Sequence, residues 1–136
     1  MSQENVEIVR RMAEAFRDGD WAASAAPLHP DMEMDTTRAP ISELAGVYKG
    51  LEEVASFWVQ WLEAWGAQHY DDPEFIDAGE QVVTWFTGHR LRGRGSNVEV
   101  GFPPYAWVAT VREGRVVRGT MYMDKEEALE AVGLRE

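Results

Sequence analysis

Tryptophan recurs at helical spacing in the segment 50–66, which holds three of the six tryptophans in the chain. Glu52 and Glu53 favour the start of a helix, and Gly66 favours its end. A face this rich in tryptophan indicates packing against a curved sheet and, in part, the lining of a hollow; ordinary core packing is the alternative. The large apolar residues of the segment fall at steps of three and four, which predicts one helical face: Leu51, Val54, Trp58, Trp61, Leu62 and Trp65.

Composition narrows the classes of protein to consider. The 136 residues predict a single domain over 1–136 with room for a real core. The net charge of −11 repels phosphate backbones, so we expect no nucleic-acid partner. The chain has no cysteine, and therefore neither disulfides nor thiolate chemistry. No apolar run is long enough for a signal peptide or a membrane span, which predicts a cytoplasmic protein without membrane contact.

The first half of the chain predicts helices and one short strand. Residues 2–17 form an amphipathic helix, and a short helix over 21–26 pairs with it as a hairpin. Asp20 is the expected cap between them. We expect a turn at His29-Pro30-Asp31, a strand over 32–35, and a loop over 36–46.

The second half predicts four strands, over 74–78, 81–92, 98–112 and 115–123, with Pro103-Pro104 interrupting the third. A last helix over 126–132 is capped by Asp124 and stopped by Gly133. An antiparallel meander of four strands has one apolar face to cover. The order of elements therefore predicts an α+β cone in which the helices pack into the concave side of the sheet around an interior pocket.

This layout and a series of short motifs resemble the SnoaL-like branch of the NTF2-like superfamily over nearly the whole chain. The motifs are Phe16-Arg-Asp-Gly-Asp-Trp21, His29-Pro-Asp-Met-Glu-Met34, Tyr48-Lys-Gly50, Phe57-Trp58, Phe75-Ile-Asp-Ala-Gly79, Gly114-Arg-Val-Val117 and Tyr122-Met-Asp124. The resemblance implies a curved antiparallel sheet wrapped around N-terminal helices, a deep pocket, and dimers formed through the outer face of the sheet. Members include steroid isomerases, polyketide cyclases, epoxide hydrolases, dehydratases and non-enzymatic binders, so the fold leaves the function open.

The catalytic residues of the ketosteroid isomerases are not kept in register. Counted from Gly19-Asp20, their tyrosine falls on Met12 and their second aspartate falls near Trp107. Their aspartate base falls near Thr36, one residue from Asp35. The paired acid and base of the epoxide hydrolases is not evident either. The resemblance therefore predicts a pocket without the steroid-isomerase apparatus.

Three polar residues are the candidates for catalysis. Trp85, Thr87 and His89 would share one strand face, which would place His89 in the pocket as a general base with a pKa lowered by burial. Tyr105 lies on the neighbouring antiparallel strand and could donate a hydrogen bond to a carbonyl or an enolate. Asp35 is the second candidate base, at the pocket mouth, with its pKa raised by apolar neighbours. The alternatives are a structural histidine, a core tyrosine and a loop-capping aspartate.

Flexible methionines and flat aromatic rings suit a dry pocket for a flat or polycyclic apolar molecule, although simple core packing would use the same residues. No two histidines have metal-ligand spacing, so we predict no metal, and the chemistry considered needs no cofactor. The candidate ligand-binding residues are Met12, Phe16, Met34, Tyr48, Trp58, Trp61, Trp65, Trp85, Trp107, Met121 and Met123.

Three functions remain in competition. The first is a cofactor-independent isomerase, cyclase or dehydratase acting by proton transfer on a small hydrophobic carbonyl compound. The second is a non-catalytic binding protein, and the third is a dimeric scaffold module. In each case we expect a homodimer through the outward face of the last strand, which would carry Val116, Arg118, Thr120 and Tyr122, while Val117, Met121 and Met123 face the helices.

Overall fold

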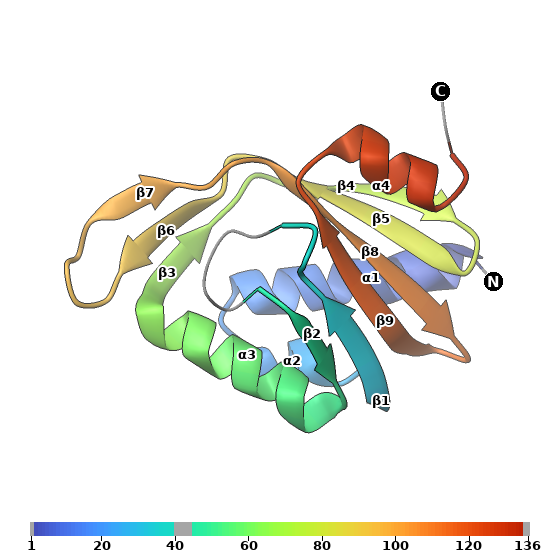
Figure 1. Ribbon diagram of the computed structural model, residues 1–136, viewed down its shortest axis with the longest axis horizontal. Helices are drawn as coiled ribbons and strands as arrows, with labels where there is room; N and C mark the ends of the chain where they lie inside the picture. The colour runs from blue at the N-terminus through green and yellow to red at the C-terminus, as the bar shows by residue number, and fades with distance from the viewer. Residues whose placement is uncertain (1, 40–44, 135–136) are drawn as a thin grey trace.

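The computed structural model describes residues 2–39 and 45–134, with backbone alone at residues 2 and 66–68. It has an open, curved sheet with the N-terminal helices on one face, so the predicted α+β class is confirmed (Figure 1). The elements are α1 (Ser2–Arg17), α2 (Trp21–Ala25), β1 (Leu28–Asp35), β2 (Val47–Lys49), α3 (Leu51–Ala64), β3 (Trp65–His69), β4 (Glu74–Ala78), β5 (Gln81–Phe86), β6 (Arg90–Gly93), β7 (Glu99–Gly101), β8 (Tyr105–Arg112), β9 (Arg115–Tyr122) and α4 (Lys125–Ala131).

The main sheet has six strands in the order β2-β1-β9-β8-β5-β4. The predicted meander is present as β4, β5, β8 and β9, and β1 extends it by pairing parallel to β9. The turn predicted at His29-Pro30-Asp31 is wrong, because these residues lie inside β1. The register of β1 against β9 shifts between Leu28 and Glu33, and a proline is tolerated at such an irregular position.

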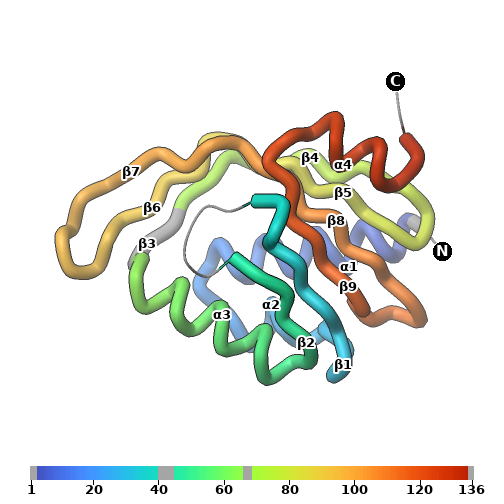
Figure 2. The backbone as a smooth tube through the Cα atoms, in the orientation of Figure 1, coloured from blue at the N-terminus to red at the C-terminus, as the bar shows by residue number. Residues whose placement is uncertain are grey.

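A second, three-stranded sheet has the order β3-β6-β7 and extends from the main sheet as an arm (Figure 2). The continuous strand predicted over 81–92 is wrong, because the chain turns at Gly88, where φ is +65°, and passes from β5 into β6. The interruption predicted at Pro103-Pro104 is confirmed, and there the chain returns from β7 to β8. The helix end predicted at Gly66 is also wrong: α3 ends at Ala64, and Trp65 is extended and begins β3.

The two faces of the main sheet carry different helices. The inner face, defined here as the face toward α1 and α3, carries a core that includes Val9, Val54 and Val82. The short helix α4 lies on the outer face, over β5, β8 and β9, although the prediction placed all helices on the concave side. Asp124 caps α4 through Glu126 N at 2.8 Å, as predicted. Over the described residues, no helix combines the length and the apolar character needed to cross a bilayer.

The side-chain alternation of β9 is broken near its start. Arg118 pairs with Thr110, but Val116 pairs with Val111, so Val117 is an extra residue between them. A bulge of this kind reverses which side chains face the helices. Val116 is therefore buried in the inner core, and its predicted place on an outward dimer face is wrong.

Candidate functional site

A cavity of about 170 Å³ lies between α1, α2, α3 and the inner face of the main sheet. Among the described residues that line it, none carries a carboxylate, and the polar side chains other than tryptophan are Ser24, Tyr70, Thr84, His89 and Tyr105. The rest of the wall is apolar, and an apolar cavity of this size is suited to an aromatic ligand. The large apolar side chains of the wall are Met12, Phe16, Trp21, Leu28, Met32, Met34, Phe57, Trp58, Trp61, Phe86, Phe102, Trp107 and Met121.

Nine of the candidate residues thus come together at the cavity: Met12, Phe16, Met34, Trp58, Trp61, His89, Tyr105, Trp107 and Met121. Tyr48 and Trp65 lie outside the lining, where they contact Phe57 and Trp61 at ring-centroid distances of 5.2 and 6.2 Å. Met123 follows β9 and packs beside the cluster that contains Tyr105.

Trp85 is not beside His89. Its neighbours on β5, Thr84 and Phe86, both line the cavity, so Trp85 points to the outer face and packs near Val83 under α4. The expected shared face of Trp85 and His89 is wrong, because β5 ends at Phe86 and the chain turns before His89.

Asp35 also lies away from the cavity. Met34 lines the cavity, so the next side chain along β1 points to the outer face. The Asp35 carboxylate accepts hydrogen bonds from Thr37 Oγ1 at 2.6 Å and from Thr37 N at 2.9 Å. The hydrogen bond from the Thr37 hydroxyl is the main reason that the pKa of Asp35 is lowered. The raised pKa predicted for Asp35 is therefore wrong, and this carboxylate is not a pocket base.

His89 and Tyr105 form the polar centre of the cavity wall. Tyr105 Oη lies 2.9 Å from His89 Nδ1, and both side chains are buried. The rings of Tyr70 and Phe102 lie 5.4 Å from the imidazole. Burial, with a smaller effect of the charge on His69, lowers the pKa of His89 to about 4. Burial likewise raises the pKa of Tyr105 well above its ordinary value. At neutral pH this is a pair of uncharged groups, an imidazole and a phenol.

Backbone contacts hold His89 in place at the crossing between the two sheets. Phe102 N donates to His89 O at 2.8 Å, just before Pro103. Asp71 N donates to Thr87 O at 3.1 Å, on the other side of Gly88. The backbone of His89 is thus held at the bend between β5 and β6, and not inside a regular strand.

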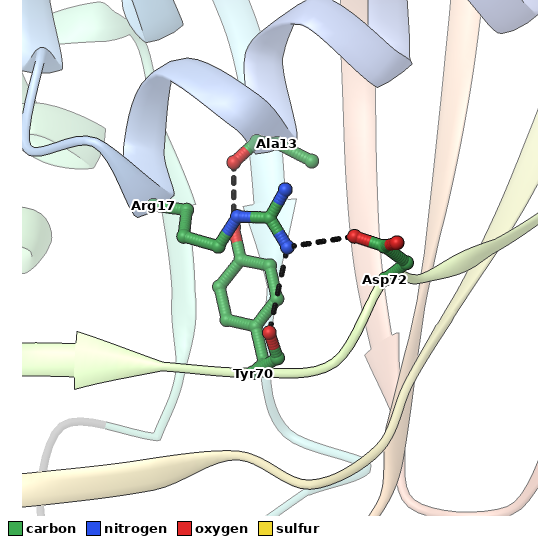
Figure 3. Close-up of polar contacts among 4 residues, drawn as sticks. All are labelled: Ala13, Arg17, Tyr70 and Asp72. Atoms are coloured by element: carbon green, nitrogen blue, oxygen red, sulfur yellow. Dashed lines mark hydrogen bonds and ion pairs between the residues drawn. The ribbon is translucent and has the colours of Figure 1, made fainter.

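Tyr70 was not anticipated from the sequence and forms another part of the wall. Its hydroxyl donates to Ala13 O at 2.5 Å, and Arg17 lies over its ring at 5.2 Å (Figure 3). Arg17 Nη1 also donates to Tyr70 O at 3.4 Å and to Asp72 Oδ1 at 3.2 Å. Burial raises the pKa of Tyr70 to about 12. Tyr70 therefore anchors the wall to α1 as a neutral phenol.

Thr84, Phe86 and Phe102 were also missed, although each lines the cavity. Alternation along 81–86 could have placed Thr84 and Phe86 on one face. Phe102 gives no such signal, because it lies in the crossing before Pro103. Within the described ranges, no three His, Asp or Glu side chains are grouped to hold a metal ion. The absence of a metal and of a cofactor stays a prediction.

Solved structures share this fold. TerC, co-crystallised with polyporic acid, is 22% identical, with 95% of this chain and 98% of that chain covered and a TM-score of 0.74. An NTF2-like protein of Burkholderia xenovorans is 26% identical, with 97% of each chain covered and a TM-score of 0.73. A putative polyketide cyclase of Xanthomonas campestris is 22% identical, with 97% and 98% covered and a TM-score of 0.70. The likenesses at 22% show the fold alone.

Among curated proteins, none matches this sequence. A family model described as a SnoaL-like domain matches residues 9–119, which include the second half of α1, all of α3, most of the main sheet and every residue that lines the cavity except Met121. The chain therefore belongs to the SnoaL-like family, with an NTF2-like fold.

Proposed function

We propose that this protein binds a small, flat, apolar carbonyl compound in the cavity, and that His89 and Tyr105 transfer a proton on it without a cofactor. The observation that supports this most is the 2.9 Å contact between Tyr105 Oη and His89 Nδ1 in an otherwise apolar wall. A buried polar pair in a dry pocket both orients an oxygen of the ligand and strengthens its interaction with that oxygen.

The two uncharged groups have complementary roles in one tautomer. When Nδ1 of His89 carries the proton, it donates to Tyr105 Oη, and the Tyr105 hydroxyl donates to the carbonyl oxygen of the ligand. The basic lone pair is then on Nε2. The C–H bond next to the carbonyl breaks, the proton passes to Nε2, and the electron pair moves onto the oxygen, where the Tyr105 hydroxyl stabilises the enolate. Return of the proton to another carbon completes an isomerisation.

The depressed pKa of His89 narrows the substrates that fit this chemistry. An imidazole with a pKa of about 4 is uncharged at neutral pH but is a weak base. It can remove a proton only from an acidic C–H, such as one between a carbonyl and an aromatic ring or a second carbonyl. The substrate class we propose is therefore a readily enolised aromatic ketone. The co-crystallisation of TerC with the organic compound polyporic acid accords with an organic ligand in this fold.

Hydrogen–deuterium exchange into 2-tetralone tests the proposal, because its benzylic C–H beside the carbonyl is acidic. We expect the protein to speed exchange above the rate in buffer. His89→Ala should lower the protein-dependent rate about 10²–10⁴-fold, with binding of 2-tetralone nearly unchanged. Tyr105→Phe should lower the rate and also weaken binding, because it removes the hydrogen bond to the carbonyl. Trp85→Phe on the outer face is the control and should keep the wild-type rate. Exchange at the buffer rate with saturating wild-type protein would contradict the catalytic role.

A second function is favoured by one observation: the described lining has no carboxylate, and Asp35 lies on the outer face. On that basis the cavity would bind its ligand without chemistry. His89→Ala would then change only the affinity, by about 1–3 kcal/mol for one buried polar partner. The exchange rate separates this function from the first.

The oligomeric state is a separate proposal. We propose a cytoplasmic homodimer through the part of the outer face that carries the exposed Arg118, next to α4. Mixed apolar and charged groups are typical of non-obligate interfaces, and a chain without cysteine needs no oxidising compartment. Light scattering at micromolar concentration tests the dimer, and a monomer mass would contradict it. Arg118→Glu should shift a dimer toward monomer.

A further inference from the structure

Thr84 brings a second polar group to the cavity. It lies on β5, its side chain is 2% exposed, and it lines the cavity. Its Oγ1 is buried and has no hydrogen-bond partner among the described residues. A buried hydroxyl without a partner destabilises a folded protein. The adjacent buried residues of the same strand, Val82 and Val83, show that β5 uses valine where only shape is needed.

The register of the main sheet sets Thr84 apart from the His89–Tyr105 pair. Phe86 is directly opposite Tyr105, and Thr84 is directly opposite Trp107. Thr84 and Tyr105 are therefore diagonal neighbours on the inner face, with their Cα atoms about 7–8 Å apart. The surface between them and around them is apolar, with the rings of Phe86 and Trp107 on either side.

We infer that Thr84 is a second hydrogen-bonding point for the ligand, which is then an aromatic or polycyclic molecule with two oxygen functions. One oxygen would meet the Tyr105 hydroxyl, and the other would meet Thr84 Oγ1 after rotation about χ1. A threonine hydroxyl donates and accepts, so the second function is either a hydroxyl or a carbonyl. This inference rests on the proposed occupancy of the cavity and specifies the class of ligand.

Two probes that differ in one oxygen test it: 2-naphthol and 2,6-naphthalenediol, measured by calorimetry or by their own fluorescence. The wild type should bind the diol several-fold to about tenfold more tightly, the equivalent of one hydrogen bond. Thr84→Val keeps the shape and removes the hydroxyl, so it should bring the two affinities together while leaving that for 2-naphthol in place. Thr84→Ser keeps the hydroxyl and should keep the preference.

The outcomes separate this inference from the proposed function. If neither naphthol binds the wild type, the proposed pocket function fails and this inference fails with it. If both bind and Thr84→Val has the same preference as the wild type, the second hydrogen-bonding point is wrong while the pocket function stands.

Unfolding of the ligand-free protein gives an independent readout. Because Oγ1 has no partner among the described residues, Thr84→Val should raise the midpoint of thermal unfolding. It should also reduce the extra rise in midpoint that the diol gives over 2-naphthol. A lower midpoint for Thr84→Val would show that the hydroxyl is already satisfied inside the protein, and would overturn the inference.

Discussion

Gly88 and Asp71 are so close that a side chain at position 88 would collide with the carboxylate, because an ideal Cβ there would overlap Asp71 Oδ2. Gly88 also has a φ of +65°, which disfavours any residue with a Cβ. The chain bends here as it passes from β5 of the main sheet into β6, and His89 follows directly after the bend. We therefore expect Gly88→Ala to lower the free energy of unfolding by more than the roughly 1–2 kcal/mol of the backbone strain alone.

The matched control is Gly79→Ala, because Gly79 has a φ of +79° but nothing within 4 Å of the position that a Cβ would take. The difference between the two variants in urea unfolding isolates the contact with Asp71. Asp71→Ala should recover that difference in the double mutant. Equal losses of unfolding free energy for Gly88→Ala and Gly79→Ala would show that the Asp71 side chain moves away from the new Cβ at no cost.

Acid should destabilise this protein through His89. The pKa of His89 is about 4 in the folded chain and about 6.5 when it is unfolded, so between these values the unfolded chain binds the extra proton. Stability is thus retained above pH 6.5 and falls as the pH drops toward 4, by about 2–3 kcal/mol. Urea unfolding at several pH values should show that the free energy of unfolding of His89→Phe varies less with pH than that of the wild type.

Trp61 both fills the core and lines the cavity. It is 8% exposed, and its ring lies 6.0 Å from that of Phe102 and 6.3 Å from that of Phe57. Trp61→Ala should therefore cost about 3–5 kcal/mol of stability and also weaken binding of 2-naphthol. Trp65→Ala, at a half-buried ring outside the lining, should cost less and leave binding unchanged. A full loss of stability with wild-type binding would exclude Trp61 from the ligand site.

The contacts between Tyr70 and α1 should stabilise the fold mainly through the hydrogen bond of the Tyr70 hydroxyl, and little through the ion pair of Arg17 with Asp72. Tyr70→Phe removes the bond to Ala13 O and should cost about 0.5–1.5 kcal/mol. Asp72→Ala removes the partner of Arg17, but the Asp72 side chain is 96% exposed. Exposed pairs contribute little, so this variant should lie within about 1 kcal/mol of the wild type. The reverse order of losses in urea unfolding would contradict this reading of the anchor.

Local signals in the sequence were sufficient to predict where the second and the last helix begin. Caps such as Asp20 and Asp124 act within a few residues of the helix they begin, and both are present. Local signals were insufficient for the strands, because strand-forming residues stand on both sides of Gly88 while the sheet to which they belong changes there. Which face a side chain occupies also depends on pairing. Val116 changed face through the extra residue Val117, and no local pattern marks that bulge.

The sequence also predicted only part of the candidate site, because local patterns do not show how strands pair. Periodicity placed Met12, Trp58 and Trp61 on faces that do meet at the cavity. His89 and Tyr105 were expected to be neighbours across a hairpin, but they meet where the chain crosses between two sheets. The predicted position of Asp35 at the pocket mouth was wrong. The side chains that alternate along β1 could be assigned to a face of the sheet only once the register of β1 against β9 was known.

His89 directly precedes β6 of the arm, and Tyr105 begins β8 of the main sheet, so their hydrogen bond is also a cross-link between the two sheets. A ligand that draws the Tyr105 hydroxyl toward itself alters this cross-link. By thermodynamic reciprocity, the position of the arm and the occupancy of the cavity then influence each other to the same degree. The backbone amides of β6 and β7 should consequently change their rate of hydrogen exchange with solvent when a ligand enters the cavity. They should do so although neither strand supplies a residue to the cavity wall.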